Sequence, residues 1–161
     1  MSRIVVVSGN PRPGSRTSGL ALAVGEAVAG RTGGFPPTVI EVGELGPGLL
    51  TPGDEATAAA VAALREAEIL VVATPTYKGS YTGVLKVLLD QLPAQALAGK
   101  TAVPVVTAGV APQAAAAEAL LRQLLTELGA RVAEGVPVVE ADLPEAKDIA
   151  DRYAERWTDQ A

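Results

Sequence analysis

Short apolar runs alternate with longer amphipathic segments along the chain. The continuous, β-branched run at residues 3–8 is typical of a buried parallel strand, and further strands are predicted over residues 38–42, 68–74, 101–107 and 131–139. Apolar residues at helical spacing predict helices over residues 19–29, 54–65, 84–92, 113–128 and 144–157. Five strands alternating with five helices predict an α/β fold with a doubly wound parallel sheet and helices on both faces.

Glycine, proline and capping residues mark the expected boundaries. Gly30 and the Gly33-Gly34 pair end the first helix, Asp54 caps the second and Gly129 follows the fourth. Residues 46–53 are rich in proline and glycine and are predicted to form a loop. Because no linker or repeat interrupts the pattern, residues 1–161 are predicted to form a single domain.

The composition is that of a folded protein, with 48% hydrophobic and 19% charged residues. No apolar run approaches the roughly 18 residues that cross a bilayer, so we expect no membrane partner. The first strand begins at Arg3, which predicts the absence of a signal peptide and a cytoplasmic location.

Charge and residue content exclude several kinds of binding and catalysis. A net charge of −5 and 3% aromatic residues argue against nucleic-acid binding. The chain has no cysteine and no histidine, so disulfides, thiolate catalysis and the commonest general base are excluded. We expect no metal site, and any reaction must use carboxylates, hydroxyls or a cofactor.

The loop at residues 9–18 joins the first strand to the first helix and has the composition of a phosphate-binding loop. Its glycines allow tight turns, the helix N-terminus attracts anions, and its polar side chains include Arg12, Ser15, Arg16, Thr17 and Ser18. It is neither a P-loop nor a G-x-G-x-x-G dinucleotide motif. An ordinary helix-capping loop is the alternative.

A second polar loop, residues 74–82, follows the third strand. In doubly wound sheets, ligands bind at the carboxyl edge where the strand order reverses, which lies between the first and third strands in the five-stranded order. The two loops are therefore expected to meet at one site.

Three segments together resemble the NAD(P)H-dependent FMN reductases, a flavodoxin-like family. They are Gly9-Asn10-Pro11-Arg12 with Ser15-Arg16-Thr17-Ser18, the stretch PTYKGSYTGVLK at residues 75–86, and the run from Leu92 to Gly109. The third segment looks like the sulfonate-utilisation branch of two-component reductases. Many members have serine at the position of Asn10, and a tyrosine often inserted in the fourth helix is missing from residues 114–120.

The resemblance implies a flavodoxin-like fold that binds FMN and takes hydride from NADPH or NADH. By position, the phosphate would be held by Asn10, Arg12, Ser15, Arg16, Thr17 and Ser18. The isoalloxazine ring would be bordered by Pro75, Thr76, Tyr77, Lys78 and Gly79, and on its other edge by Thr107, Ala108 and Gly109. A homodimer or homotetramer is expected, with reduced FMN passing to a flavin-dependent monooxygenase or another acceptor such as a quinone.

Hydride transfer from nicotinamide C4 to flavin N5 needs no protein acid or base, so we expect no catalytic side chain. A flavodoxin-type electron carrier without enzymatic activity is the main alternative. Acidity suits a carrier, but flavodoxins usually lack arginines in the first loop and have more aromatic residues. A phosphate-binding regulatory module without a redox role is the third hypothesis.

Several other residues are expected to have structural roles. Arg122 and Arg131 are predicted to be solvated, and Asp90 to lie on a helix surface or an interface. Trp157 is predicted to anchor the last helix. Core packing and oligomer contact are predicted for Leu85, Leu88, Leu89 and Leu92.

Overall fold

The computed structural model describes residues 2–157 as a parallel sheet between two helical layers. The strand order is β2-β1-β3-β4-β5, and β6 also pairs with β4. The strands are β1 (Ile4–Ser8), β2 (Thr38–Glu41), β3 (Ile69–Pro75), β4 (Thr101–Ala108), β5 (Arg131–Val132) and β6 (Val136–Val139). Every pairing is parallel, which confirms the predicted fold class. Residues 1 and 158–161 of the predicted domain lie outside the described residues.

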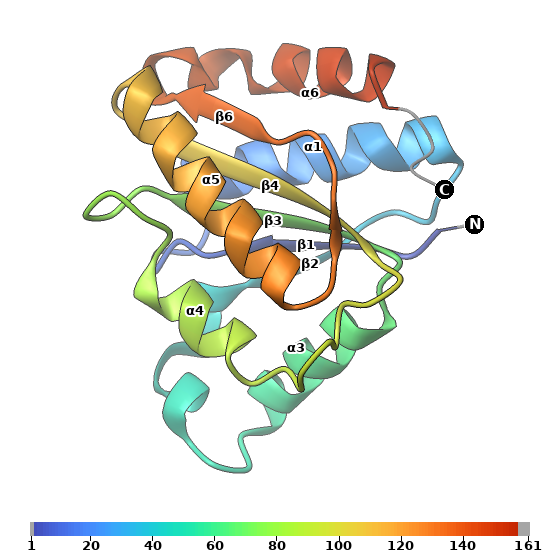
Figure 1. The fold of residues 1–161 in the computed structure, drawn as a ribbon, viewed down its shortest axis with the longest axis vertical. Coiled ribbons are helices and arrows are strands. Elements are labelled where there is room, and N and C mark those ends of the chain that lie inside the picture. The colour runs from blue at the N-terminus through green and yellow to red at the C-terminus, as the bar shows by residue number, and fades with distance from the viewer. Residues whose placement is uncertain (1, 158–161) are drawn as a thin grey trace.

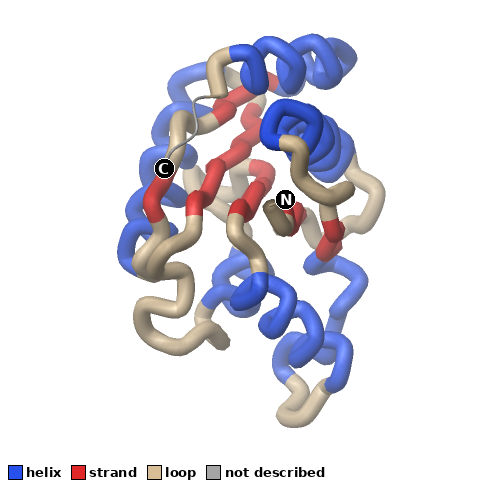
Figure 2. Tube along the Cα trace, turned by 90° about the vertical axis from the view of Figure 1, so that its right-hand side faces the viewer, coloured by secondary structure: helices blue, strands red, loops and turns tan. Residues whose placement is uncertain are grey.

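Helices cover both faces of this sheet (Figures 1 and 2). They are α1 (Arg16–Thr32), α2 (Val42–Leu45), α3 (Glu55–Glu66), α4 (Gly83–Leu89), α5 (Ala111–Glu127) and α6 (Ala146–Glu155), with 3₁₀ segments η1 (Gly46–Leu50) and η2 (Glu140–Glu145). α1 and α6 pack on one face, and α3, α4 and α5 on the other. In β1, Ile4 and Val6 face the first layer, and Val5 and Val7 the second.

The core contains the residues that the apolar pattern selected. Leu85, Leu88, Leu89 and Leu92 are buried, although α4 ends at Leu89. Trp157 is buried, and its ring centroid lies 6.1 Å from that of Tyr153, which confirms its packing role. Asp90 lies at the exposed end of α4 and forms an ion pair with Lys86 at 2.7 Å.

Several predicted boundaries were wrong. α1 begins at Arg16 instead of residue 19, because the Ser15 hydroxyl caps the helix by accepting from the Ser18 N–H. Residues 46–53 contain η1, and the short helix α2 precedes it. At the other end of the chain, η2 accommodates Pro144 and leaves a shorter closing helix, α6.

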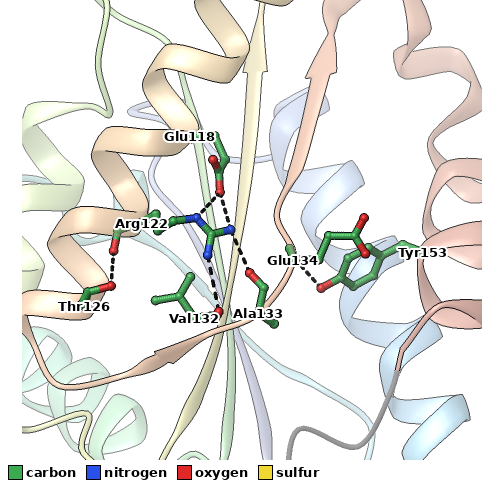
Figure 3. Close-up of polar contacts among 7 residues, drawn as sticks. All are labelled: Glu118, Arg122, Thr126, Val132, Ala133, Glu134 and Tyr153. Carbon is green, nitrogen blue, oxygen red and sulfur yellow. Dashed lines mark hydrogen bonds and ion pairs between the residues drawn. The ribbon is translucent and has the colours of Figure 1, made fainter.

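The prediction of one fifth strand over residues 131–139 was also wrong, because the edge strand is broken between β5 and β6 (Figure 3). Arg122 of α5 donates to the carbonyl oxygens of Val132 at 3.4 Å and Ala133 at 2.9 Å. The Tyr153 hydroxyl of α6 donates to the carbonyl oxygen of Glu134 at 2.6 Å. Side chains thus satisfy three consecutive carbonyls, from the last residue of β5 into the break.

Arg122 is therefore not the solvated surface residue that we predicted. Its Nε and Nη2 atoms also donate to Glu118 Oε1 at 3.0 and 2.7 Å, which holds the guanidinium in place (Figure 3). Periodicity did not reveal this contact, because the acceptors are backbone atoms of a segment that the sequence pattern assigns to a strand.

Candidate functional site

A pocket of about 410 Å³ lies at the carboxyl edge of the sheet, beyond the ends of β1, β3 and β4. Its walls are formed by Asn10, Arg12, Pro13, Gly14, Ser15, Arg16, Thr17, Pro75, Tyr77, Thr107, Glu140 and Leu143. A pocket of similar volume, about 400 Å³, lies beside Arg3 and Phe35, near the starting ends of the strands. Ligands of open α/β sheets bind at the carboxyl edge, so the first pocket is the candidate site.

The first loop is folded as a cradle at the N-terminus of α1. Gly14 has a φ of +71°, a left-handed conformation that glycine adopts without strain. Asn10 is buried, and its Oδ1 accepts from the backbone N–H of Arg12 at 2.9 Å, so its Nδ2 is the atom left to donate. The amides of Arg16 and Thr17 lie in the first helical turn, where no intrahelical acceptor exists. This arrangement is suited to an anion.

The Thr82 side chain and backbone tie the first loop to the second. Its hydroxyl donates to the carbonyl of Gly9 at 2.6 Å, and its N–H donates to the Thr74 hydroxyl at 3.1 Å. The same hydroxyl oxygen caps α4 by accepting from the Leu85 N–H at 3.3 Å. Thr82 is buried, so these bonds fix the relative positions of the two loops.

A two-residue turn forms the tip of the second loop. The backbones of Tyr77 and Ser80 exchange hydrogen bonds of 2.9 and 3.2 Å, and φ is +52° at Lys78 and +82° at Gly79. Two successive positive φ values are typical of a type I′ turn. The loop reaches away from the body of the molecule (Figure 1). Tyr77 is 47% exposed, which leaves its ring available to a planar ligand.

The pocket brings together eight of the predicted site residues: Asn10, Arg12, Ser15, Arg16, Thr17, Pro75, Tyr77 and Thr107. Thr76 lies behind it and donates to the carbonyl of Thr107 at 2.8 Å. Lys78 and Gly79 form the turn beyond Tyr77, and Ala108 and Gly109 follow Thr107 without lining the pocket.

Three predicted site residues have hydroxyls that are engaged within the protein. The hydroxyl oxygens of Thr17 and Thr107 lie 2.8 Å apart in a buried contact between α1 and β4. Ser18 lies beneath the loop, where its Oγ donates to Glu41 Oε1 at 2.5 Å. Thr17 can therefore offer an anion its backbone N–H more readily than its side chain.

Three residues around the site, two of which are acidic, were missed in the sequence analysis. Glu41 ends β2, and its second oxygen, Oε2, accepts from the Gly14 N–H at 2.5 Å. Glu140 and Leu143 belong to η2 and line the pocket. Glu41 could have been found, because the predicted order places the end of the second strand beside the end of the first. No comparable feature of the sequence indicates that η2 lies at the pocket.

Within residues 2–157, no group of three or more His, Cys, Asp or Glu side chains is arranged to hold a metal ion. No helix of that stretch combines the length and apolar character needed to cross a membrane.

Residues 2–142 match the family described as NADPH-dependent FMN reductase. An FMN reductase (NADPH) of Escherichia coli K12 is 44% identical over 68 residues, which cover 42% of this chain and 36% of that protein. The NADH-dependent FMN reductase SfnF of Pseudomonas putida is 38% identical over 111 residues, covering 66% and 58%. The matched stretches thus span about one third to three fifths of these relatives.

Solved structures extend the likeness over the whole fold. The apo form of NADH:FMN oxidoreductase EmoB superimposes with a TM-score of 0.77 and 34% identity, over 99% of this chain and 92% of that chain. A flavodoxin from the domain Archaea, at a TM-score of 0.64 and 18% identity over 96% and 97% of the two chains, supports the fold alone. A match over most of the chain, on a fold whose sheet edge presents the motifs in one pocket, shows that this chain belongs to the NADPH-dependent FMN reductase family.

Proposed function

We propose that the protein is an NAD(P)H:FMN oxidoreductase whose flavin binds in the carboxyl-edge pocket. One observation carries the proposal: the anion cradle of α1 and the exposed ring of Tyr77 line the same pocket. A phosphate and a planar ring system are the two parts of FMN that such walls suit. The matched relatives are named FMN reductases and an NADH:FMN oxidoreductase, which supports the same activity here.

The residues present fit the phosphate of FMN. The backbone amides of Arg16 and Thr17, the Nδ2 of Asn10 and the hydroxyl of Ser15 would donate to its oxygens. The guanidinium groups of Arg12 and Arg16 would balance its charge.

The other two loops would contain the ring. Pro75 and Tyr77 would cover one side of it and exclude water, while Lys78 and Gly79 extend this cover beyond the pocket wall. Thr76 would support the same side, and Thr107 would form the opposite boundary, with Ala108 and Gly109 following it beyond the pocket wall. Bound flavin supplies the redox chemistry by accepting hydride from reduced nicotinamide, and no side chain of this chain is required to move a proton.

The electron acceptor, the cell compartment and the oligomeric state are further parts of this proposal. Reduced flavin would pass to a monooxygenase of a two-component system or to another acceptor, and the cell compartment would be the cytoplasm. Leu50 is 80% exposed and borders, with Val87, a surface hollow of about 440 Å³. A homodimer or homotetramer, as the family resemblance implies, is part of the same proposal.

Steady-state oxidation of NADPH and NADH, with and without added FMN, tests the activity. The expected result is FMN-dependent oxidation of at least one nicotinamide at a rate proportional to the protein concentration. A protein that binds FMN but oxidises neither nicotinamide would refute the reductase and favour the electron carrier. A protein that binds phosphate but no flavin would favour the regulatory module.

A further inference from the structure

A carboxylate of the chain itself, which does not line the pocket, accepts hydrogen bonds from donors of the phosphate loop and of the helix that follows it. Glu41 Oε1 accepts from the Ser18 hydroxyl and Glu41 Oε2 accepts from the Gly14 N–H, both at 2.5 Å. Gly14 belongs to the loop and Ser18 to the first turn of α1, so both donors lie where an anion is favoured. Glu41 thus uses two donors of the cradle.

The sheet register explains why Glu41 lies there. Glu41 is the last residue of β2 and pairs with Ser8, the last residue of β1. The hydroxyl oxygens of Ser8 and Ser18 are 2.6 Å apart, so a chain of polar contacts runs from Ser8 through Ser18 to Glu41. A hydroxyl has one proton, and Ser18 gives it to Glu41, so Ser18 cannot also donate to a phosphate.

We infer that Glu41 is an internal competitor for the flavin phosphate and keeps FMN exchangeable. This inference rests on the proposed function. A phosphate that uses the Gly14 and Ser18 donors must displace the carboxylate, and one that binds beside it meets a like charge at short range. Both routes weaken binding of the phosphate without affecting the ring, so Glu41 would favour a flavin that is released after reduction.

The test compares Glu41→Gln with wild type and with Glu44→Gln. Glutamine keeps the size and the acceptor oxygen but removes the charge. Glu44 is exposed, three residues along in α2, so Glu44→Gln removes the same charge away from these contacts. Dissociation constants for FMN and for riboflavin, which lacks the phosphate, are measured by fluorescence titration of each protein.

Glu41→Gln should bind FMN roughly 2- to 30-fold more tightly than wild type, the range of one charge effect at a helix terminus. Its riboflavin affinity should be unchanged, and Glu44→Gln should match wild type with both flavins. Unchanged or weaker FMN binding by Glu41→Gln overturns the inference, as does an equal gain with riboflavin.

The two proposals fail in distinguishable ways. If wild type reduces FMN and Glu41→Gln shows no gain in affinity, the inference alone is wrong. If neither protein binds FMN, both proposals are wrong. A measurement on wild type guards against misfolding of the variant. The Gly14 amide resonance should shift on saturation with FMN and stay in place with riboflavin. An unmoved Gly14 resonance with FMN overturns the inference, because a phosphate that displaces Glu41 or binds beside it would change the surroundings of this amide.

Discussion

Arginine has a different role at each of two positions in this protein. Arg12 lies exposed in a loop and can direct its guanidinium toward an anion, whereas Arg122 uses its guanidinium to satisfy backbone carbonyls. The sequence identified the first, because Arg12 lies among glycines and hydroxyl residues before a helix. It could not identify the second, because the acceptors of Arg122 become available only where a strand is broken.

Arg12→Ala should weaken FMN binding by about 1–3 kcal/mol, because it removes a charge-assisted hydrogen bond to the phosphate. Arg31→Ala is the matched control, since Arg31 is exposed in the last turn of α1, away from the cradle. Titration with FMN and with riboflavin checks the prediction. An equal loss with both flavins would mean that Arg12 does not act on the phosphate.

Gly43→Ala should displace the phosphate loop. A Cβ on Gly43 would lie 2.7 Å from the carbonyl carbon of Pro11 and 2.9 Å from the carbonyl oxygen of Asn10, both backbone atoms. We expect a loss of stability of about 1–3 kcal/mol together with weaker FMN binding. Gly30→Ala has open space around its Cβ and serves as control. A Gly43→Ala protein with wild-type melting temperature and FMN affinity would show that the loop yields without cost.

At the scale of elements, the sequence predicted what depends on continuous local pattern. The strands β1, β3 and β4 are buried on both faces and were found from their apolar runs. The edge strand was found as well, but its break between β5 and β6 was not, because the break depends on tertiary contacts from α5 and α6. Pocket residues from η2 were missed for the same reason: only the folded sheet brings that segment to the site.

Arg122→Met should cost about 1–2 kcal/mol of stability, since it leaves the carbonyls of Val132 and Ala133 without their donor. Arg122→Lys keeps the charge but not the planar fork, so an intermediate loss is expected. Urea denaturation of the three proteins checks this order. Equal midpoints for Arg122→Met and wild type would show that water satisfies these carbonyls.

Burial raises the pKa of the Tyr153 phenol above its ordinary value. The folded state therefore holds this proton more tightly than the unfolded chain, whose tyrosine pKa is about 10. Stability from Tyr153 is fully present below that pH and is lost as the pH rises beyond it. Tyr153→Phe should be less stable than wild type at neutral pH, and the gap should narrow in alkaline denaturation curves. A gap of constant size would show that folding does not change the pKa of Tyr153.

At the scale of the whole molecule, the doubly wound order places three motifs from distant parts of the chain in one pocket. The sequence predicted this convergence, because the carboxyl ends of neighbouring parallel strands share an edge. The sequence did not predict which hydroxyl groups at this edge hydrogen-bond within the protein. The pairing of Thr17 with Thr107, and of Ser18 with Glu41, depends on strand register and on the first turn of α1.

Anaerobic mixing of the protein with FMN and reduced nicotinamide tests the central claim, which is hydride transfer from NAD(P)H to flavin held in this pocket. The loss of oxidised-flavin absorbance is followed together with nicotinamide oxidation. The account predicts that both proceed at the same rate, that this rate rises with protein concentration until FMN is saturated, and that no third reactant is needed. Bound flavin that stays oxidised in the presence of both NADPH and NADH would contradict it.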